Sequence, residues 1–227
     1  MVRLVLFDID GTLVHTGGAG VKAFRKVFET EFNAVDGFEK LKFAGRTDLS
    51  LVREFFNLHA VPASPANFKR FFERYVFWLD HILHQGKTVV CPGVWDFLRG
   101  LDALPRPPIK GLLTGNIRLG AEIKLRSCCM WDQFVIGGFA DDHEERDRIA
   151  AVARRRGCNL LQEELPADQV VVVGDTPLDI RCARAIGAKV LAVATGGAKL
   201  DELKAHHPDW VVPDLTHISP AEIAGCG

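Results

Sequence analysis

The sequence predicts an α/β protein with a doubly wound parallel sheet and an inserted all-helical domain, and two observations lead to this prediction. First, short runs of β-branched and large apolar residues recur along the chain, each followed by Gly, Thr or Asp and then by a helical pattern. Such alternation of strand and helix is typical of a parallel sheet covered by helices. Second, residues 15 to 85 show helical periodicity and no convincing strand.

Five apolar runs predict the strands of the sheet: residues 1–8, 109–113, 134–136, 170–173 and 190–193. The first run is almost unbroken, as expected for a strand that is buried on both faces.

Three segments predict the helices of the insert: residues 21–32, 48–58 and 67–83. Asp48 is a candidate N-cap of the second helix. Of the 15 phenylalanines, 11 fall in this region, which is more than one amphipathic helix needs. We therefore expect two domains, a core formed by residues 1–14 and 87–227 and a helical domain formed by residues 15–86. Glycines 17, 18, 20, 86 and 93 flank the crossings and are either hinges or ordinary linkers.

Length, charge and composition are those of an ordinary soluble globular protein. The 227 residues carry 28 basic and 29 acidic side chains, and 48% are hydrophobic. This balance creates no field that attracts nucleic-acid phosphates, so we expect no nucleic-acid partner. No apolar run approaches the ~20 residues of a membrane span, which predicts a cytoplasmic protein without a membrane partner. The six cysteines lack CxxC spacing, so we expect reduced thiols.

Carboxylates follow two of the predicted strands. Asp8 and Asp10 lie at the end of the first strand, where open parallel sheets bind ligands, and Gly11 lets the chain turn behind them. Asp175 ends a later strand, and Asp179 follows in the first turn of the next helix. These four carboxylates would repel one another unless a cation lay among them. Mg²⁺ is the natural occupant, because it takes oxygen ligands and no His or Cys ligand for zinc accompanies them.

Three motifs together resemble the haloacid dehalogenase (HAD) superfamily, and within it phosphatases similar to phosphoglycolate phosphatase. They are DxDGT at residues 8–12, Thr-Gly-Asn at residues 114–116 and GDxxxD at residues 174–179. The resemblance implies a HAD-type, Rossmann-like sheet, and the helical insert resembles the C1-type cap that closes over it. It also implies a Mg²⁺-dependent phosphatase acting on a small phosphorylated metabolite, with phosphoglycolate as one candidate.

The resemblance assigns a role to each motif residue. Asp8 would be the nucleophile that forms an aspartyl-phosphate, and Asp10 the general acid and then the base. Thr114 would hold a phosphoryl oxygen, as would the following N–H groups of Gly115 and Asn116.

The same resemblance implies how magnesium and the substrate are held. Asp8 and Asp175 would bind Mg²⁺ directly, the backbone carbonyl of Asp10 would reach it, and Asp179 would orient the ion or its water. Gly11 would lie against the substrate.

One part departs from the family's pattern. The lysine that the family usually places before the helix preceding the last motif is absent, but some members look similar with arginine there. Arg146 is the preferred replacement and Arg148 the alternative, since either guanidinium could pair with Asp8 and phosphate. In the cap, Arg46 lies in a Gly-Arg-Thr-Asp segment that resembles the family's substrate-facing one, and would bind the anionic end of a substrate.

Other functions share this fold. A dehalogenase would not need an acid two residues after its nucleophile, because halide leaves without protonation. A phosphomutase of the β-phosphoglucomutase type would carry the same motifs and remains an alternative. A non-catalytic binding protein also remains, although it would be expected to lose one of the four carboxylates. The sequence favours an enzyme and leaves its substrate and oligomeric state open.

Overall fold

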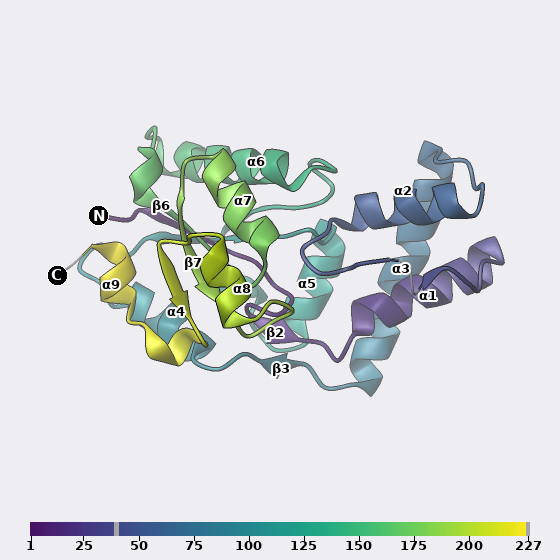
Figure 1. The fold of residues 1–227 in the computed structure, drawn as a ribbon, viewed down its shortest axis with the longest axis horizontal. Helices are drawn as coiled ribbons and strands as arrows, with labels where there is room; N and C mark the ends of the chain where they lie inside the picture. The colour runs from purple at the N-terminus through teal and green to yellow at the C-terminus, as the bar shows by residue number, and fades with distance from the viewer. Residues whose placement is uncertain (39–40, 226–227) are drawn as a thin grey trace.

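A six-stranded parallel sheet forms the centre of the protein (Figure 1). The computed structural model describes residues 1–38 and 41–225. The strands lie in the order β5-β4-β1-β6-β7-β8, and each pairs in parallel with its neighbours. Their bounds are β1 Leu4–Phe7, β4 Ile109–Leu113, β5 Ile136–Gly138, β6 Val170–Gly174, β7 Lys189–Val193 and β8 Trp210–Val212.

Strand β1 is buried on both faces because its alternate side chains enter two different cores. Leu4 and Leu6 pack into the core that contains side chains of α6, α7 and α8, whereas Val5 and Phe7 pack into the core that contains side chains of α4, α5 and α9. Helices therefore cover both faces of the sheet. Their bounds are α4 Val94–Asp102, α5 Arg118–Arg126, α6 Arg146–Leu161, α7 Pro177–Ala185, α8 Leu200–Ala205 and α9 Pro220–Ala224.

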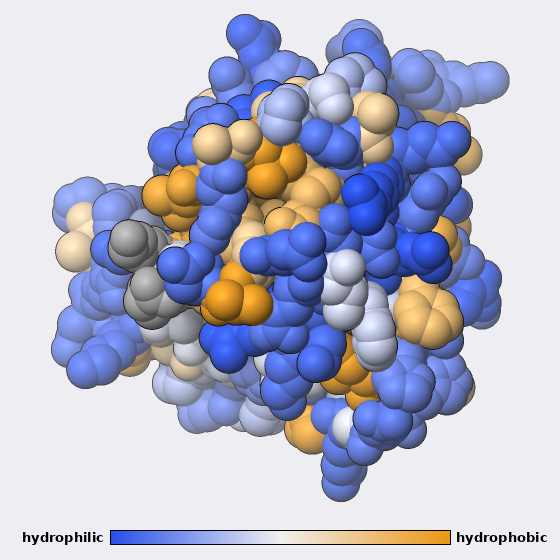
Figure 2. Space-filling model, turned by 90° about the vertical axis from the view of Figure 1, so that its right-hand side faces the viewer, coloured by the Kyte–Doolittle hydropathy of each residue, from blue (hydrophilic) through white to orange (hydrophobic). Residues whose placement is uncertain are grey.

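Three further helices form the insert between β1 and the rest of the sheet. They are α1 Ala19–Phe32, α2 Asp48–Leu58 and α3 Pro65–Gln85, and their phenylalanines build a separate apolar core. Figure 1 shows them grouped at one end of the molecule, with both termini at the other. Seen from the helical end, the surface is largely hydrophilic with separate apolar patches (Figure 2). The predicted fold class is confirmed, whereas the domain boundaries at residues 15 and 86 remain a prediction.

The two chain crossings into and out of the insert pair with each other. Strands β2 Val14–His15 and β3 Val89–Val90 form a two-stranded antiparallel sheet, which the sequence did not predict. A strand of two residues is too short for an alternating pattern to be recognised.

Two predictions for the main sheet were incomplete. Strand β5 begins at Ile136, two residues after the predicted start, and continues through Gly137 and Gly138, which pair with β4. The apolar residue Phe134 packs into a core instead of belonging to the strand. Strand β8 was missed, since it has only three residues and each is partly exposed at the edge of the sheet.

No helix within the described residues is long and apolar enough to cross a membrane. The five cysteines in the described part of the chain are free thiols, as expected: Cys91, Cys128, Cys129, Cys158 and Cys182. The sixth, Cys226, lies outside the described residues.

The phenylalanine core should depend strongly on Phe28. Its ring is fully buried and stacks on Phe55, with 3.7 Å between ring centroids, and it also contacts Phe71. We expect Phe28→Ala to lower the free energy of unfolding by about 3–5 kcal/mol, because the cavity cannot fully collapse. Urea denaturation measures this loss. Phe77→Ala is the control, since Phe77 is 59% exposed and its loss should cost within about 0.5 kcal/mol. Equal losses in the two variants would contradict this account of the core.

Candidate active site

The sheet brings three polar strand ends together. Asp8 follows β1, Thr114 follows β4 and Asp175 follows β6. Strand β1 lies between β4 and β6 and pairs with both, so these residues meet at one edge of the sheet. The order of the strands reverses about β1, and open α/β sheets bind ligands beyond the carboxyl ends of their strands at such a point.

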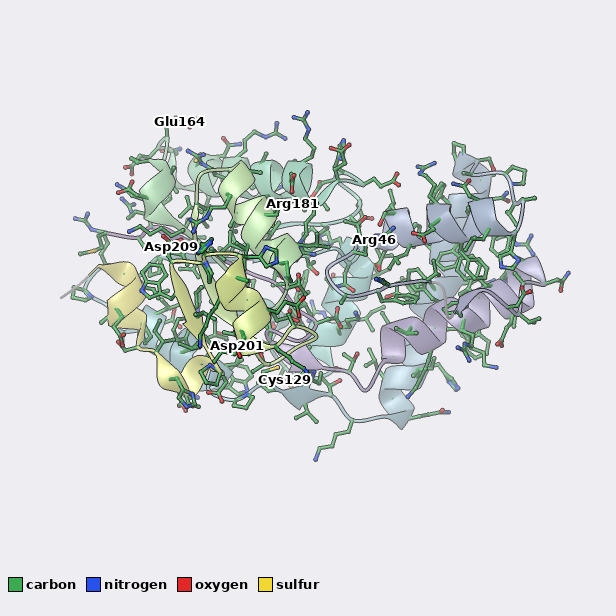
Figure 3. The ribbon with its side chains drawn as sticks, in the orientation of Figure 1. Arg46, Cys129, Glu164, Arg181, Asp201 and Asp209 are labelled. Carbon is green, nitrogen blue, oxygen red and sulfur yellow. The ribbon has the colours of Figure 1, made fainter. Side chains whose placement is uncertain are left out.

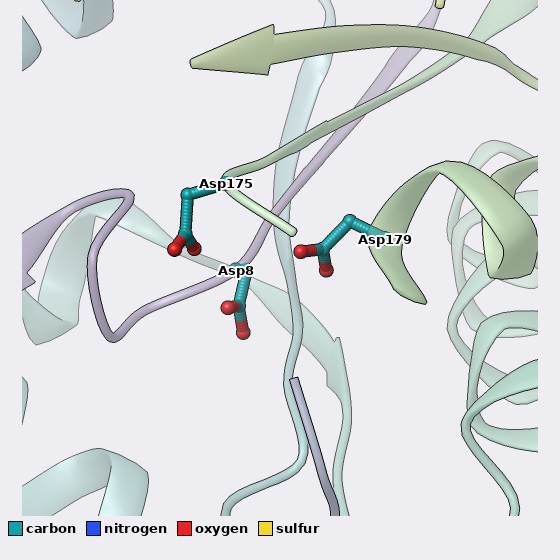
Figure 4. A group of neighbouring side chains, drawn as sticks. All are labelled: Asp8, Asp175 and Asp179. Carbon is teal, nitrogen blue, oxygen red and sulfur yellow. The ribbon is translucent and has the colours of Figure 1, made fainter. Parts of the chain in front are cut away.

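Asp8, Asp175 and Asp179 form a compact group of buried carboxylates (Figure 4). One oxygen of each lies within 4.8 Å of the others. Thr12 Oγ1 and the Gly197 N–H donate to Asp175, at 3.0 Å and 3.1 Å. These bonds fix the group at the end of the sheet.

Asp179 is held by the start of its own helix and by a cation. The N–H and Oγ1 of Thr176, the N-cap of α7, donate to Asp179 Oδ2 at 3.0 Å and 2.7 Å. Arg146 binds the other oxygen, Oδ1. Both oxygens therefore already have partners, an arrangement suited to orienting neighbouring groups.

The three-carboxylate group is buried and carries more negative than positive charge. Burial raises the pKa of Asp8 to about 6, even though the Arg146 guanidinium acts to lower it. Burial, together with repulsion from the carboxylates of Asp179 and Asp8, raises the pKa of Asp175 to about 8. Three carboxylates and one guanidinium leave an excess of two negative charges when all are ionised. An all-oxygen group of this charge fits a hard divalent cation such as Mg²⁺.

Arg146 is the cation beside this group. It is the first residue of α6 and is 4% exposed, and its Nη2 lies 3.1 Å from Asp8 Oδ1. Nη1 donates to the backbone carbonyl of Gly45 at 3.3 Å, whereas Nε is buried without a hydrogen-bond partner among the described residues. A buried donor without a partner costs free energy. Such a donor is expected at a site where a bound anion accepts its hydrogen bond. The alternative, Arg148, is exposed and has no part in this group.

Asp10 lies outside the three-carboxylate group and has its own cation. Lys124 Nζ donates to Oδ1 and Oδ2 of Asp10 at 2.8 Å and 2.6 Å, and Asn116 Nδ2 donates to Oδ2 at 2.8 Å. Burial acts to raise the pKa of Asp10, but the charge and hydrogen bonds of Lys124 and the bond from Asn116 outweigh it and lower this pKa. The first motif therefore holds two carboxylates in opposite electrostatic environments.

The Thr-Gly-Asn segment, residues 114–116, forms a tight loop between the three-carboxylate group and the Asp10–Lys124 pair. Thr114 Oγ1 accepts hydrogen bonds from the backbone N–H and Nδ2 of Asn116, at 3.3 Å and 2.7 Å. A Cβ at Gly115 would lie 2.2 Å from the carbonyl oxygen of Arg46, so only glycine permits this close approach. Gly11 is equally constrained: its φ is +85°, and a Cβ there would lie 2.6 Å from Asp175 Oδ2. These two glycines allow other chain segments to approach the carboxylates.

The start of α2 differs from the prediction by one residue. Thr47, and not Asp48, is the N-cap, because Thr47 Oγ1 accepts the N–H of Ser50. Asp48 instead contacts the sheet domain, where its Oδ2 accepts the N–H of Ile117 at 2.8 Å and its own N–H donates to the Gly115 carbonyl at 2.7 Å. Burial raises the pKa of Asp48 to about 7, although Lys124 acts to lower it.

Arg46 lies at the junction between the sheet and the helical insert (Figure 3). Its Nη2 pairs with Glu54 at 2.8 Å, and its Nε donates to Ser50 at 3.3 Å. The side chain is partly exposed. In this arrangement the guanidinium is already paired with a carboxylate of the helix that follows it, α2, so a substrate anion would have to compete for it.

A cavity of about 560 Å³ extends from the three-carboxylate group and Asp10 to the helical insert. All the candidate site residues line it except Asp179, which is fully buried behind them. On the insert side its wall includes Val21, Phe24, Phe43 and Tyr75. The site thus opens from the carboxylates toward an aromatic and aliphatic surface.

Lys124 is the site residue that the sequence reasoning missed. It is 3% exposed, lines the cavity and contacts Asp10. Its signal was the position of a lysine on the apolar face of a helix, among Gly120, Ala121 and Leu125, which are all buried. Helical spacing predicts that the Lys124 ammonium lies in the interior. A buried lysine needs a charged or polar partner, so this position could have been recognised as a candidate site residue.

Comparison with known proteins identifies relatives that span nearly the whole chain. The family model described as haloacid dehalogenase-like hydrolase matches residues 5–193. Probable phosphatase IndB of Dickeya dadantii is 26% identical over 225 residues, which cover 96% of this chain and 92% of that protein. The phosphoglycolate phosphatase of Pseudomonas savastanoi pv. phaseolicola is 25% identical, with 96% of this chain and 79% of that protein covered.

Solved structures share the fold. The crystal structure of a predicted phosphoglycolate phosphatase from Haemophilus somnus matches with a TM-score of 0.75 at 20% sequence identity. The match covers 100% of this chain and 98% of that one. It therefore includes the sheet and the helical insert together.

The excess of negative charge predicts how stability depends on pH. A carboxyl with a raised pKa is more readily protonated in the folded protein, so stability is lost as the pH rises from the unfolded pKa to the folded one. In EDTA, wild type should lose more stability between pH 5 and pH 8 than Asp175→Asn does. The expected difference is on the order of 2 kcal/mol or more, since one pKa unit corresponds to about 1.4 kcal/mol.

Thermal and urea denaturation at both pH values measure this difference. Mg²⁺ should stabilise wild type at pH 8 and should stabilise Asp175→Asn much less. Asp201→Asn is the control, because Asp201 is 94% exposed and should behave as wild type. Identical pH dependence in wild type and Asp175→Asn would show that the charge of Asp175 is compensated.

Proposed function

Because the chain belongs to the family of haloacid dehalogenase-like hydrolases, we propose that it is a Mg²⁺-dependent phosphatase that hydrolyses the monoester of a small phosphorylated metabolite. One observation carries this proposal: two carboxylates two residues apart occupy opposite electrostatic environments at the end of β1. Asp8 faces Arg146 and two further carboxylates, whereas Asp10 faces Lys124. A divalent cation held by the three-carboxylate group would keep Asp8 ionised, as a nucleophile requires, and Asp10, which lies apart from that group on its own partners, is the carboxyl available for proton transfer.

The proposed reaction has two steps. In the first, Asp8 attacks phosphorus and forms an aspartyl-phosphate while Asp10 protonates the departing oxygen. In the second, Asp10 takes a proton from water, which attacks the aspartyl-phosphate and releases inorganic phosphate. A proton donor at Asp10 is needed for an alcohol leaving group and not for halide, and this favours phosphatase over dehalogenase chemistry.

Several groups are available to hold the phosphoryl oxygens. The unpaired Nε of Arg146, the hydroxyl of Thr114 and the N–H of Gly115 are donors at this end of the cavity. The N–H of Asn116 would join them by exchanging Thr114 Oγ1 for a phosphoryl oxygen. Asp8 and Asp175 would hold Mg²⁺ with the backbone carbonyl of Asp10, and Asp179 would orient the ion or its water. The ion, when bound, supplies positive charge between the nucleophile and the phosphoryl group.

The substrate is proposed to be small, because the cavity of about 560 Å³ is enclosed partly by the helical insert. We propose that residues 15–86 act as a cap that opens for entry, over a catalytic domain of residues 1–14 and 87–227. Phosphoglycolate is one candidate, supported by the relatives that bear that name. Arg46 on the cavity wall would then exchange Glu54 for the substrate's anionic end.

The proposed function predicts phosphate release that requires both Asp8 and magnesium. A panel of phosphorylated metabolites that includes phosphoglycolate would be incubated with Mg²⁺ or with EDTA, and inorganic phosphate would be measured. Asp8→Asn should lower the rate by about a thousandfold or more while leaving the fold intact, because it removes the nucleophile. Activity that persists in Asp8→Asn without deamidation back to Asp would refute the nucleophile. Absence of release by folded, metal-loaded wild type would refute the phosphatase.

Arg146 and Arg148 offer a matched pair for the phosphate-binding cation. Arg146→Ala should lower kcat/KM by about 10² to 10³, since it removes a buried charge beside Asp8 and the phosphoryl site. Arg148→Ala should remain near wild type, because its side chain is exposed. Steady-state kinetics on the best substrate measures both, and Arg146→Lys keeps a charge if the alanine variant is unstable. Equal, mild losses would contradict the choice of Arg146.

A further inference from the structure

Lys124 is a buried lysine whose ammonium is fully engaged. Only 4% of its side chain is exposed. Its Nζ lies 2.8 Å from Asp10 Oδ1, 2.6 Å from Asp10 Oδ2 and 2.6 Å from Asn116 Oδ1. An ammonium has three N–H donors, and these three acceptors can use all of them. Although Lys124 lines the cavity, it has no free donor for a substrate while this network is intact.

The same network treats the two oxygens of Asp10 differently. Oδ2 accepts from both Lys124 and Asn116, whereas Oδ1 accepts from Lys124 alone. The side chain of Asp10 is 43% exposed and also lines the cavity. With two donors, Oδ2 has both of its lone pairs engaged, whereas Oδ1, with one donor, keeps a lone pair that is free for proton exchange with a ligand.

We propose that Lys124 is a positioning residue that, with Asn116, orients the Asp10 carboxyl so that Oδ1 carries out proton transfer; this rests on the proposed function. In the first step the Oδ1 proton passes to the leaving oxygen as its bond to phosphorus breaks and the Asp8–phosphorus bond forms. In the second, Oδ1 takes a proton from water as the water oxygen bonds to phosphorus and the Asp8–phosphorus bond breaks. The products are an alcohol and inorganic phosphate, and Asp10 is protonated again.

The location of Lys124 connects this orientation to the helical insert. Helix α5, which carries Lys124, packs against α3 of the insert. At this contact Gly120 of α5 lies near Tyr75 and Leu79 of α3. A Cβ at Gly20 of α1 would lie 3.4 Å from Lys124 Nζ and 3.6 Å from the hydroxyl of Tyr75. The ammonium is thus packed against residues of the insert, although all of its hydrogen-bond partners belong to the sheet domain.

The experiment compares two classes of ester in Lys124→Met. The value of kcat/KM reports the steps through transfer to Asp8, and general-acid assistance is worth about 10² to 10⁴ for a poor leaving group. For the best alkyl phosphate of the panel we expect kcat/KM to fall by about a hundredfold. For 4-nitrophenyl phosphate we expect a fall of less than about fivefold, because nitrophenolate departs without a proton. A merely structural role would lower both values equally.

Two controls separate this role from general damage. Lys110→Met removes a lysine that is 11% exposed and pairs with Asp102 away from the cavity, and both esters should react as in wild type. In an Asp10→Asn background, Lys124→Met should cause no further loss on the alkyl ester, because the residue it positions is gone. Lys124→Gln keeps one donor and applies the same test if the methionine variant does not fold.

Each outcome decides between the possibilities. A loss confined to the alkyl ester and absent in the Asp10→Asn background supports the inference. Equal losses on both esters, or an independent loss added to that of Asp10→Asn, overturn it while leaving the proposed function intact. Hydrolysis of neither ester by wild type would instead reject the proposed function, and this inference with it.

Discussion

The constraint on which the site depends is the burial of three carboxylates at the ends of β1 and β6. Moving charged groups out of water is costly unless partners compensate them. Arg146 compensates part of this charge, and Thr12, Thr176 and the Gly197 N–H donate hydrogen bonds to the rest. Burial, together with the repulsion that remains among the carboxylates, raises the pKa of Asp8 to about 6 and that of Asp175 to about 8. Such uncompensated charge in a cavity is characteristic of a functional site.

The chain separates its two neighbouring carboxylates by giving each a different cation. Asp8 directly follows β1 and faces Arg146 from α6, on one side of the sheet. Asp10 lies at the turn before Gly11 and faces Lys124 from α5, whose buried side chains enter the core on the other side. Proximity in sequence therefore does not produce one acidic cluster. The two helices that follow β4 and β5 supply the cations, and this allows one carboxylate to bind charge while the other handles protons.

The sequence predicted the features that depend on local patterns and missed those that depend on tertiary contacts. Buried strands and their polar ends were recognisable because a parallel strand is apolar throughout and ends abruptly, as at Asp8 and Asp175. Strand β8 was too short and too exposed to show such a pattern. Asp48 was predicted as an N-cap because aspartate is common at that position of a helix. Its carboxylate instead accepts the N–H of Ile117 in the sheet domain. Lys124 belongs to no motif, and its only signal in the sequence is its place on the apolar face of α5.

Several hydrogen bonds between insert and sheet end on backbone carbonyls, which side-chain patterns in the sequence do not reveal. The Asp48 N–H donates to the Gly115 carbonyl, Thr47 Oγ1 donates to the Glu144 carbonyl, and Arg146 donates to the Gly45 carbonyl. These bonds place the turn before α2 against both the Thr114 loop and the start of α6. Asp48 is buried at this contact, and burial raises the pKa of its carboxyl to about 7. Thr114 and Arg146 are buried beside it, where electrostatic interactions are stronger than in water, so the packing of the insert against the sheet also shapes the candidate anion site.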